Sequence, residues 1–181
     1  MRLFEAKDLT KKYDKTVLNH LDFSIAPRMK IKQFLYEPYH YFYHLNKKEA
    51  MTAIKKILEQ VGMDETCLGK YPHELSGGQL QRISIARALI IQPQLLICDE
   101  ITSSLDQVIQ RDIIELLKQC VYKYHMAILF VSHDLSLVHE FCHQVLVLND
   151  GKIIEKGTIQ QLYKSENEVV QNLLKAAYLN G

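Results

Sequence analysis

Two acidic residues and a histidine stand where apolar segments of the sequence end, and together they suit phosphate chemistry. The run LLIC (95–98) is followed at once by Asp99 and Glu100, and the run MAILFVS (126–132) is followed by His133. Short apolar runs of this kind are typical of strands buried on both faces. Because neighbouring parallel strands end at one edge of a sheet, we expect the three side chains to converge there.

A hydrophobic strand that ends in Asp-Glu is the Walker B pattern. In that pattern Asp99 holds Mg²⁺, often through water, since this cation keeps most of its own waters. Glu100 then orients an attacking water or accepts its proton. The alternative is a pair of solvated acids at a strand end, and Asp-Glu after four apolar residues does not by itself decide between the two.

The stretch LSGGQLQR (75–82) offers a second candidate site. Ser76 at the start of a helix and Gln79 three residues later match a capping box. With Gly77 and Gly78 between them, the free N–H groups and the positive end of the helix dipole suit an anion. An ordinary helix cap is the alternative reading, but the string LSGGQ is more specific than a cap requires.

In their order along the chain, these motifs resemble those of the ATP-binding subunits of ABC transporters. The longer string YPHELSGGQLQR (71–82) is most similar to the branch that energises import of peptides, nickel and metal chelates. The resemblance extends from Leu3 to about Leu162. The matching motifs are LSGGQ (75–79) for the signature, LLICDE (95–100) for the Walker B strand, SSLD (103–106) for the D-loop and His133 for the switch histidine.

The resemblance implies ATP and Mg²⁺ as cofactors. In the family, two such domains sandwich two ATP molecules, each between the phosphate loop of one subunit and the signature of the other. The implied partners are a second ABC ATPase subunit, as a homo- or heterodimer, and membrane permease subunits. The implied location is cytoplasmic, peripheral at the inner face of the cell membrane. The implied site residues are Glu100 and His133 for catalysis, Asp99 for the metal, and Tyr13, Ser76, Gly77, Gly78, Gln79 and Asp106 for the nucleotide.

The sequence departs from the family pattern at two places. Ile101 stands where the family commonly has proline, and the sequence contains no G-x-x-x-x-G-K-[ST] and no glycine before Gly62. The segment from Arg28 resembles the family's stretch that begins after the glutamine loop, so Gln33 is not the glutamine-loop residue. We therefore expect the phosphate-loop strand, loop and helix, at least ~30 residues, and the glutamine loop to be missing between Ala26 and Arg28.

Strands and helices alternate after residue 93, which predicts an α/β fold with a parallel sheet. By resemblance the fold is P-loop NTPase-like, with an inserted helical subdomain and without the phosphate-loop strand and helix. We expect N-terminal strands of the ATPase core at 1–26, the helical subdomain at 27–92 and the α/β core at 93–181. The expected elements are two strands before residue 26, helices at 46–61 and 76–91, strands at 95–98, 126–131 and 145–148, helices capped by Asp106 and Asp134, a hairpin at 149–151 and a helix over roughly 158–178.

Composition bounds the class of protein. The chain has 181 residues, 48% apolar and 24% charged, which is ordinary for a soluble globular protein. A net charge of +1 gives no electrostatic case for binding nucleic acid. The absence of a basic face and of long heptad arms also argues against a chromosome-maintenance ATPase. The longest apolar run, 126–131, is far short of the ~20 residues of a membrane helix. Four scattered cysteines predict a reduced cytosolic protein with buried thiols.

Two further motifs need an interpretation. HEFCH (139–143) matches the zinc pattern H-E-x-x-H, but it lies where the family has variable residues, and a chance match is favoured. YHYFYH (39–44) interleaves aromatic residues with histidines. Because the neighbouring positive charge is thin, a helical surface that packs on a membrane subunit is favoured over stacking with nucleic acid.

The sequence therefore predicts the ATP-binding, energy-coupling subunit of an importer for peptides, nickel or metal chelates. Without its phosphate loop we expect the chain's own ATP site to be defective, which leaves ATPase activity open. The alternative is a non-catalytic remnant that at most donates its LSGGQ signature (75–79) to a partner ATPase.

Overall fold

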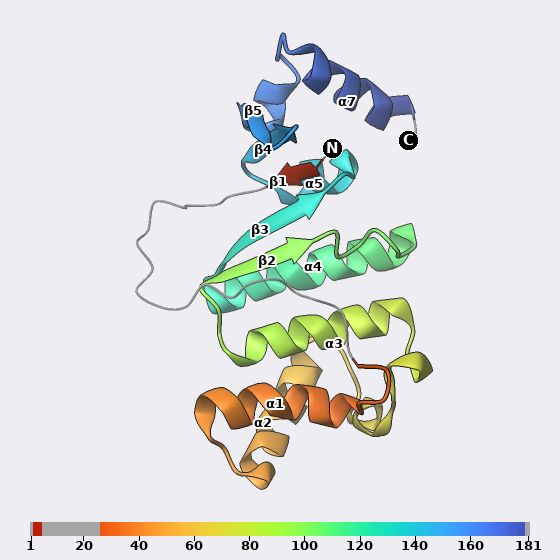
Figure 1. Cartoon of the computed structure of the whole chain (residues 1–181), viewed down its shortest axis with the longest axis vertical. Helices are drawn as coiled ribbons and strands as arrows, with labels where there is room; N and C mark the ends of the chain where they lie inside the picture. Colours follow the sequence, from red (N-terminus) through yellow and green to blue (C-terminus); the bar gives the residue numbers. More distant parts are fainter. Residues whose placement is uncertain (1, 5–25, 180–181) are drawn as a thin grey trace. The chain divides into compact units, whose positions relative to one another are not determined.

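The structure is a computed structural model that describes residues 2–4 and 26–179. It divides into two compact units, which we describe separately (Figure 1). Of the described residues, the helical unit comprises 26–93 and 104–116, and the sheet unit comprises 2–4, 94–103 and 117–179. The expected division of the chain at residues 26 and 92 stays a prediction.

The helical unit is built on helices whose first turns are capped as the sequence predicts. In α2, the Asn46 side chain accepts hydrogen bonds from the N–H groups of Lys48 and Glu49, both at 3.0 Å. The Glu49 carboxylate accepts the Asn46 N–H in return at 3.2 Å, which completes the capping box. The helices are α1 (Ile31–Tyr43), α2 (Lys47–Gln60) and α3 (Gly77–Ile90), with the short 3-10 turns η1 (Glu65–Gly69) and η2 (Pro72–Glu74).

Arg87 of α3 holds α1 in place. Its guanidinium donates to the backbone carbonyl of Phe34, lies 4.1 Å from the centre of the Phe34 ring and pairs with the Glu37 carboxylate at 3.0 Å. Apolar side chains of the three helices fill the space between them. Those that are almost fully buried include Ile31, Leu35, Ile54, Leu58, Ile83, Ile85 and Leu89.

The sheet unit contains a five-stranded sheet in the order β2-β3-β1-β4-β5. β2 and β3 pair in parallel, as predicted. The sheet is mixed rather than fully parallel, because β1 lies between β3 and β4 and runs antiparallel to both. The second expected N-terminal strand lies outside the described residues. The strands are β1 (Arg2–Phe4), β2 (Leu95–Asp99), β3 (Ala127–Ser132), β4 (Val145–Asn149) and β5 (Lys152–Gly157).

The hairpin between β4 and β5 forms as the residues Asn149-Asp150-Gly151 predict. Asp150 and Gly151 have φ of 48° and 73°, the left-handed values that a two-residue hairpin turn of the I′ type needs. The expected C-terminal helix is instead two helices, α6 (Ile159–Leu162) and α7 (Glu168–Leu179). α6 ends in a turn, and the Asn167 side chain then accepts the Val169 N–H at 3.0 Å.

Two further helices connect the strands of the sheet. α4 (Gln107–Tyr124) follows β2 and α5 (Leu135–Phe141) follows β3. Asp134 caps α5 by accepting the N–H groups of Ser136 and Leu137, as expected. Side chains of α5, β4, α6 and α7 pack into one apolar core. Its buried members are Leu135, Val138, Val145, Val147, Leu162, Val170 and Leu174.

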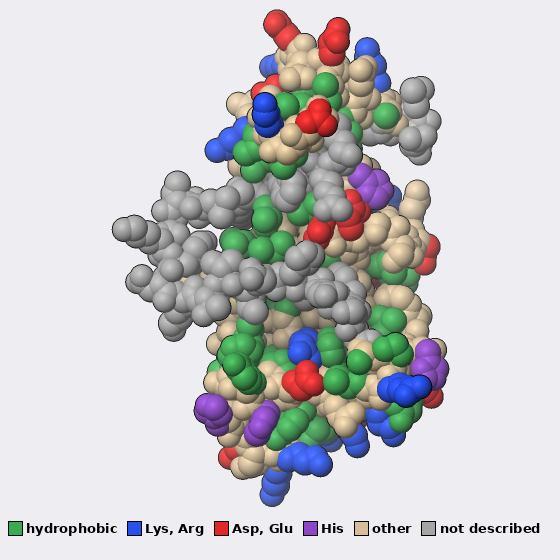
Figure 2. Space-filling model, viewed as in Figure 1, with side chains coloured by type: hydrophobic (Ala, Val, Ile, Leu, Met, Phe, Trp, Pro, Cys, Tyr) green, Lys and Arg blue, Asp and Glu red, His purple; other side chains and the backbone are tan. Residues whose placement is uncertain are grey.

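Most of the thiols are buried, as the composition predicts. Basic and acidic side chains are interspersed on the face shown in Figure 2. Within residues 2–4 and 26–179, no helix is long and apolar enough to cross a membrane. Cys67, Cys98 and Cys120 are buried, and Cys142 is half-buried. Burial raises the pKa of the Cys98 thiol strongly and that of Cys120 to about 11, which keeps both protonated and unreactive.

Candidate functional site

Glu100 and His133 meet at the carboxyl ends of β2 and β3, where the sequence predicts them. The Nδ1 atom of His133 lies 3.0 Å from Oε1 and 2.9 Å from Oε2 of Glu100. Since a carboxylate only accepts, the imidazole carries its proton on Nδ1 in this contact. The Glu100 side chain is 26% exposed and that of His133 is 63% exposed, so the pair is open to a ligand from solvent.

The backbone at Glu100 is held in an uncommon conformation. Its φ is 52°, in the left-handed region that few residues other than glycine adopt. Three hydrogen bonds fix it there: the Glu100 N–H donates to the carbonyl of Val131 at 2.9 Å, and the N–H and hydroxyl of Ser103 donate to the Glu100 carbonyl at 3.2 and 2.9 Å. The turn after β2 therefore aims the carboxylate at His133 rather than along the strand.

Asp99 is the last residue of β2 and lies level with Val131 of β3. It is half-buried, one residue before the Glu100 turn. Carboxylate oxygens are the ligands that Mg²⁺ prefers, so Asp99 fits the metal in ligand type. Among the described residues, no group of three or more His, Cys, Asp or Glu side chains is placed to hold a metal ion by itself.

The signature segment LSGGQ lies in the helical unit, at the start of α3. Ser76 Oγ accepts the Gln79 N–H at 3.3 Å, and Gln79 Oε1 accepts the Ser76 N–H at 3.1 Å, so the predicted capping box is present. Gly77 is exposed and Gly78 is buried. The first N–H groups of a helix have no partner inside it, and the binding of an anion or nucleotide by Ser76, Gly77, Gly78 and Gln79 stays a prediction.

Gly78 is required by packing within the helical unit. A Cβ atom at this position would lie 2.6 Å from Cγ2 of Ile109 on α4, and one at Gly77 would lie 3.2 Å from the Leu105 side chain. α4 begins next to this contact because Asp106 caps it, accepting the N–H groups of Val108 and Ile109 at 3.1 and 3.0 Å. The structure thus gives Asp106 a capping role, and its contact with a nucleotide stays a prediction.

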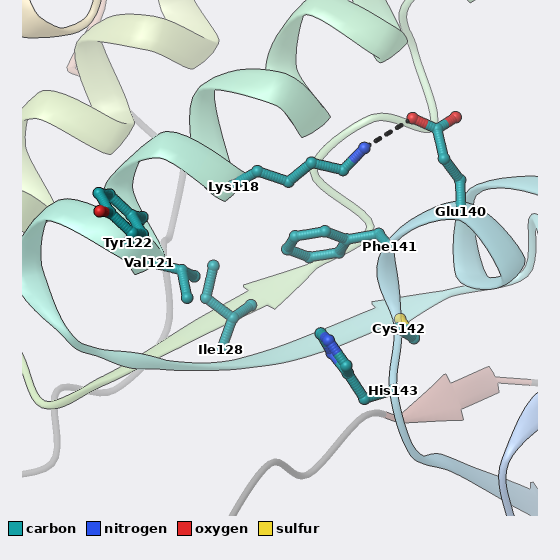
Figure 3. Close-up of a pocket in the computed structure, with 8 residues that line it drawn as sticks. All are labelled: Lys118, Val121, Tyr122, Ile128, Glu140, Phe141, Cys142 and His143. Carbon is teal, nitrogen blue, oxygen red and sulfur yellow. Dashed lines mark hydrogen bonds and ion pairs between the residues drawn. The ribbon is translucent and has the colours of Figure 1, made fainter.

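The predictions for Tyr13 and for HEFCH (139–143) have separate outcomes. Tyr13 lies outside the described residues. In HEFCH, His139 lies on α5 but His143 follows the end of that helix at Phe141, and the chance match that the sequence favours stays the interpretation. Glu140 and His143 line a pocket of about 520 Å³ between α4, β3 and α5, where Glu140 pairs with Lys118 at 3.0 Å (Figure 3). His139 instead faces Tyr163, with 6.5 Å between the ring centres.

Arg82 is a supporting residue that the sequence did not single out. Its guanidinium donates to the carbonyl of Val61 at the end of α2, at 2.8 Å, and lies 3.9 Å from the Asp112 carboxylate of α4. It therefore joins the signature helix to both neighbours. Arg82 belongs to the motif LSGGQLQR, and this is the one sequence feature that could have singled it out. Its partners Val61 and Asp112 are distant in sequence, so the contacts themselves could not be predicted.

The described residues include donors of the type that a metal prefers, but they do not form a metal-binding cluster or a cradle for a nucleotide. Asp99, Glu100 and His133 offer carboxylates and an imidazole at one sheet edge. A bound triphosphate also needs a cradle of backbone N–H groups and a lysine, and the sequence has no G-x-x-x-x-G-K-[ST] to form one.

The fold and the motifs define a nucleotide-binding cassette. The structure is similar to the dimeric MJ0796 bacterial ABC transporter cassette, with a TM-score of 0.66 and 26% identity over 76% of this chain and 60% of that one. It is equally similar to the same cassette bound to ADP and Pi. The model of the ABC transporter family matches residues 4–103. The chain belongs to this family.

Nickel import proteins are among the curated relatives of this chain. The chain is 38% identical over 158 residues to the nickel import ATP-binding protein NikE of Escherichia coli (strain K12). It is 39% identical to NikE of Shigella boydii serotype 4 (strain Sb227) over the same length. These alignments include 86% of this chain but 59% of each relative, so the chain matches little more than half of their length.

Proposed function

We propose that this chain is an ATP-binding, energy-coupling subunit of an ABC importer for peptides, nickel or metal chelates, internally truncated so that its own ATP site is defective. One observation carries the proposal. The signature helix is formed and capped by Ser76 and Gln79, while the sequence contains no phosphate-loop motif. The similarity to nickel import proteins supports the solute class.

The loss of ATP affinity that follows from a missing phosphate loop can be estimated. A phosphate loop gives ATP several charge-assisted hydrogen bonds, worth ~2 kcal/mol each. Losing three of them removes about 6 kcal/mol, roughly four decades of affinity. A micromolar site would then bind too weakly to fill at cellular ATP concentrations.

The family mechanism divides the surviving residues into two groups. Asp99, Glu100 and His133 act on the ATP held by the same chain's phosphate loop, so they have no nucleotide to act on. The signature acts on the ATP of the partner subunit, so Ser76, Gly77, Gly78 and Gln79 keep a task. The second candidate function follows: a non-catalytic chain that donates its signature to a partner ATPase.

The proposed partners are a second ABC ATPase subunit and membrane permease subunits, at the cytoplasmic face of the cell membrane, without nucleic acid. The end of α1 supports the permease contact. Tyr41, Phe42 and Tyr43 are 75, 54 and 43% exposed there, and His40 and His44 flank them. Exposed aromatic residues gathered in this way are typical of protein interfaces.

Mixing the chain with a second ABC ATPase tests the proposed function. The chain alone is expected to show no Mg²⁺-dependent ATP turnover, and adding it to a phosphate-loop-bearing ABC ATPase is expected to raise that protein's turnover. Ser76→Arg should remove the gain. Asn46→Arg is the matched control, because it removes a helix cap of the same unit but leaves the signature intact. Turnover by the chain alone that Glu100→Gln abolishes would contradict the proposed defect. No stimulation by the unaltered chain would rule out signature donation.

A further inference from the structure

The pocket drawn in Figure 3 lies within the sheet unit and has the size of a small-molecule site. Its volume is about 520 Å³, inside the range of roughly 300–1,000 Å³ that such sites span. Its walls come from α4, from β3 and from the segment in which α5 ends. Among the described residues that line it, none belongs to the signature or the Walker B strand, and His133 is not one of them. A ligand in this pocket would therefore use residues to which the motifs assign no task.

The inner wall of the pocket is apolar and already in place. Ile128 of β3 is buried, and the half-buried Phe141 is held by an edge-to-face contact with Phe130, with 5.5 Å between the ring centres. The half-buried Val121 of α4 completes this wall, and Figure 3 shows it beside Ile128. Because apolar groups gain free energy when they leave water, the wall favours an apolar part of a ligand.

The polar rim of the pocket carries one charge of each sign. Nζ of Lys118 lies 3.0 Å from Oε1 of Glu140, and the two side chains are 37 and 44% exposed. An ion pair as exposed as this contributes little to folding stability, so a ligand that inserts between its members costs the fold little. Tyr122, Cys142 and His143 supply the other polar atoms of the lining. The rim thus suits a ligand that brings both a positive and a negative charge.

The spacing of the two rim charges selects the kind of zwitterion. In a free α-amino acid, the ammonium nitrogen and the carboxyl carbon are both bonded to Cα and lie about 2.5 Å apart. This spacing is close to the 3.0 Å between Lys118 and Glu140, so each ligand charge can meet the opposite charge of the rim. In a dipeptide the terminal charges lie up to about 3.8 Å further apart and match the pair less well. The volume alone would admit either molecule, so the charge spacing decides.

We propose that this pocket binds a free α-amino acid with an apolar side chain, as its zwitterion. The α-ammonium group donates to the Glu140 carboxylate, and the α-carboxylate accepts from the Lys118 ammonium group. The apolar side chain of the ligand lies against Phe141, Val121 and Ile128. The inference goes beyond the proposed function and does not depend on it, because the site needs no bound nucleotide.

Calorimetric titration of the full chain with L-phenylalanine and with L-leucine tests the site. We expect saturable binding of at least one of them. No binding of either at concentrations up to roughly 10 mM, which would fill a millimolar site, overturns the proposal.

Three analogues of the amino acid that binds separate its chemical groups. Glycine lacks the apolar side chain, the N-acetyl derivative lacks the ammonium charge, and the amide lacks the carboxylate. Each should bind at least tenfold more weakly, because it loses either the apolar contact or one charge-assisted hydrogen bond. An N-acetyl derivative or an amide that binds as tightly as its parent overturns the recognition of a zwitterion, and glycine that binds as tightly overturns the role of the apolar wall.

Two substitutions on the chain assign each charge to its partner. Glu140→Gln should weaken binding of the amino acid at least tenfold and leave the weaker binding of its N-acetyl derivative unchanged. Lys118→Met should weaken binding of the amino acid equally and leave that of the amide unchanged. Glu166→Gln and Lys164→Met are matched controls at exposed positions outside the lining, and neither should alter binding. Thermal unfolding checks that each variant is folded. Unchanged affinity of both folded pocket variants, or an equal loss in the controls, places the ligand elsewhere and overturns the proposal.

Discussion

At the residue scale, a carboxylate at the end of β2 and an imidazole at the end of β3 lie in direct contact. The ends of two apolar runs place Glu100 and His133 at one edge, and the 2.9 Å contact confirms that expectation. The left-handed backbone of Glu100 was not predictable, because its φ depends on hydrogen bonds from Ser103 and to Val131 that only the folded chain provides.

The glycines of the signature make a second residue-scale prediction. Gly78→Ala should destabilise the helical unit, because its Cβ would lie 2.6 Å from the Ile109 side chain. Overpacking of this kind costs about 1–3 kcal/mol. Gly69→Ala is the matched control, with nothing within 4 Å of the added Cβ. Urea unfolding of both variants measures the difference, and equal stability would show that α3 and α4 are not in the contact described.

Buried thiols predict how stability depends on pH. The folded pKa of Cys120 is about 11 against an ordinary value of 9.0. Between these values the folded chain keeps a proton that the unfolded chain releases, so the free energy of unfolding should fall as pH rises from 9 to 11. Below pH 9 this thiol should have no effect. Cys120→Ala should make the fall shallower in chemical unfolding at several pH values; an unchanged slope would place the thiol in solvent.

At the scale of elements, capping residues predicted the helices well. Asn46, Ser76, Asp106 and Asp134 each begin a helix where the sequence indicates, because their short side chains bond N–H groups of the first turn. The C-terminal segment was predicted less well: the polar run 164–167 separates α6 from α7, whereas one helix was expected.

Removing one cap should have a defined cost. Asn46→Ala leaves two N–H groups of α2 without the Asn46 side chain and should lower the free energy of unfolding by about 1 kcal/mol. Thr52→Ala, an exposed change further along the same helix, should not lower it. Denaturant titrations followed by circular dichroism make the comparison. A loss as large for Thr52→Ala as for Asn46→Ala would mean that the cap contributes nothing specific.

At the scale of the whole molecule, the family and its ordered motifs were predictable, and the strand order was not. The position of β1 depends on pairing between segments more than 100 residues apart, such as Leu3 with Ser132 and Val147. A period-two pattern shows that a strand forms but does not show which neighbour it joins or in which direction. The mixed sheet therefore emerged only from the structure.

We propose that this chain keeps the motifs of an ABC cassette but does not hold ATP by itself. Isothermal titration of the purified chain with ATP and Mg²⁺ tests it most directly. We predict no heat of binding at nucleotide concentrations up to roughly 1 mM, since losing the phosphate loop removes about four decades of affinity. Micromolar binding that Asp99→Asn weakens would contradict the account, because the residues present would then suffice for a nucleotide site.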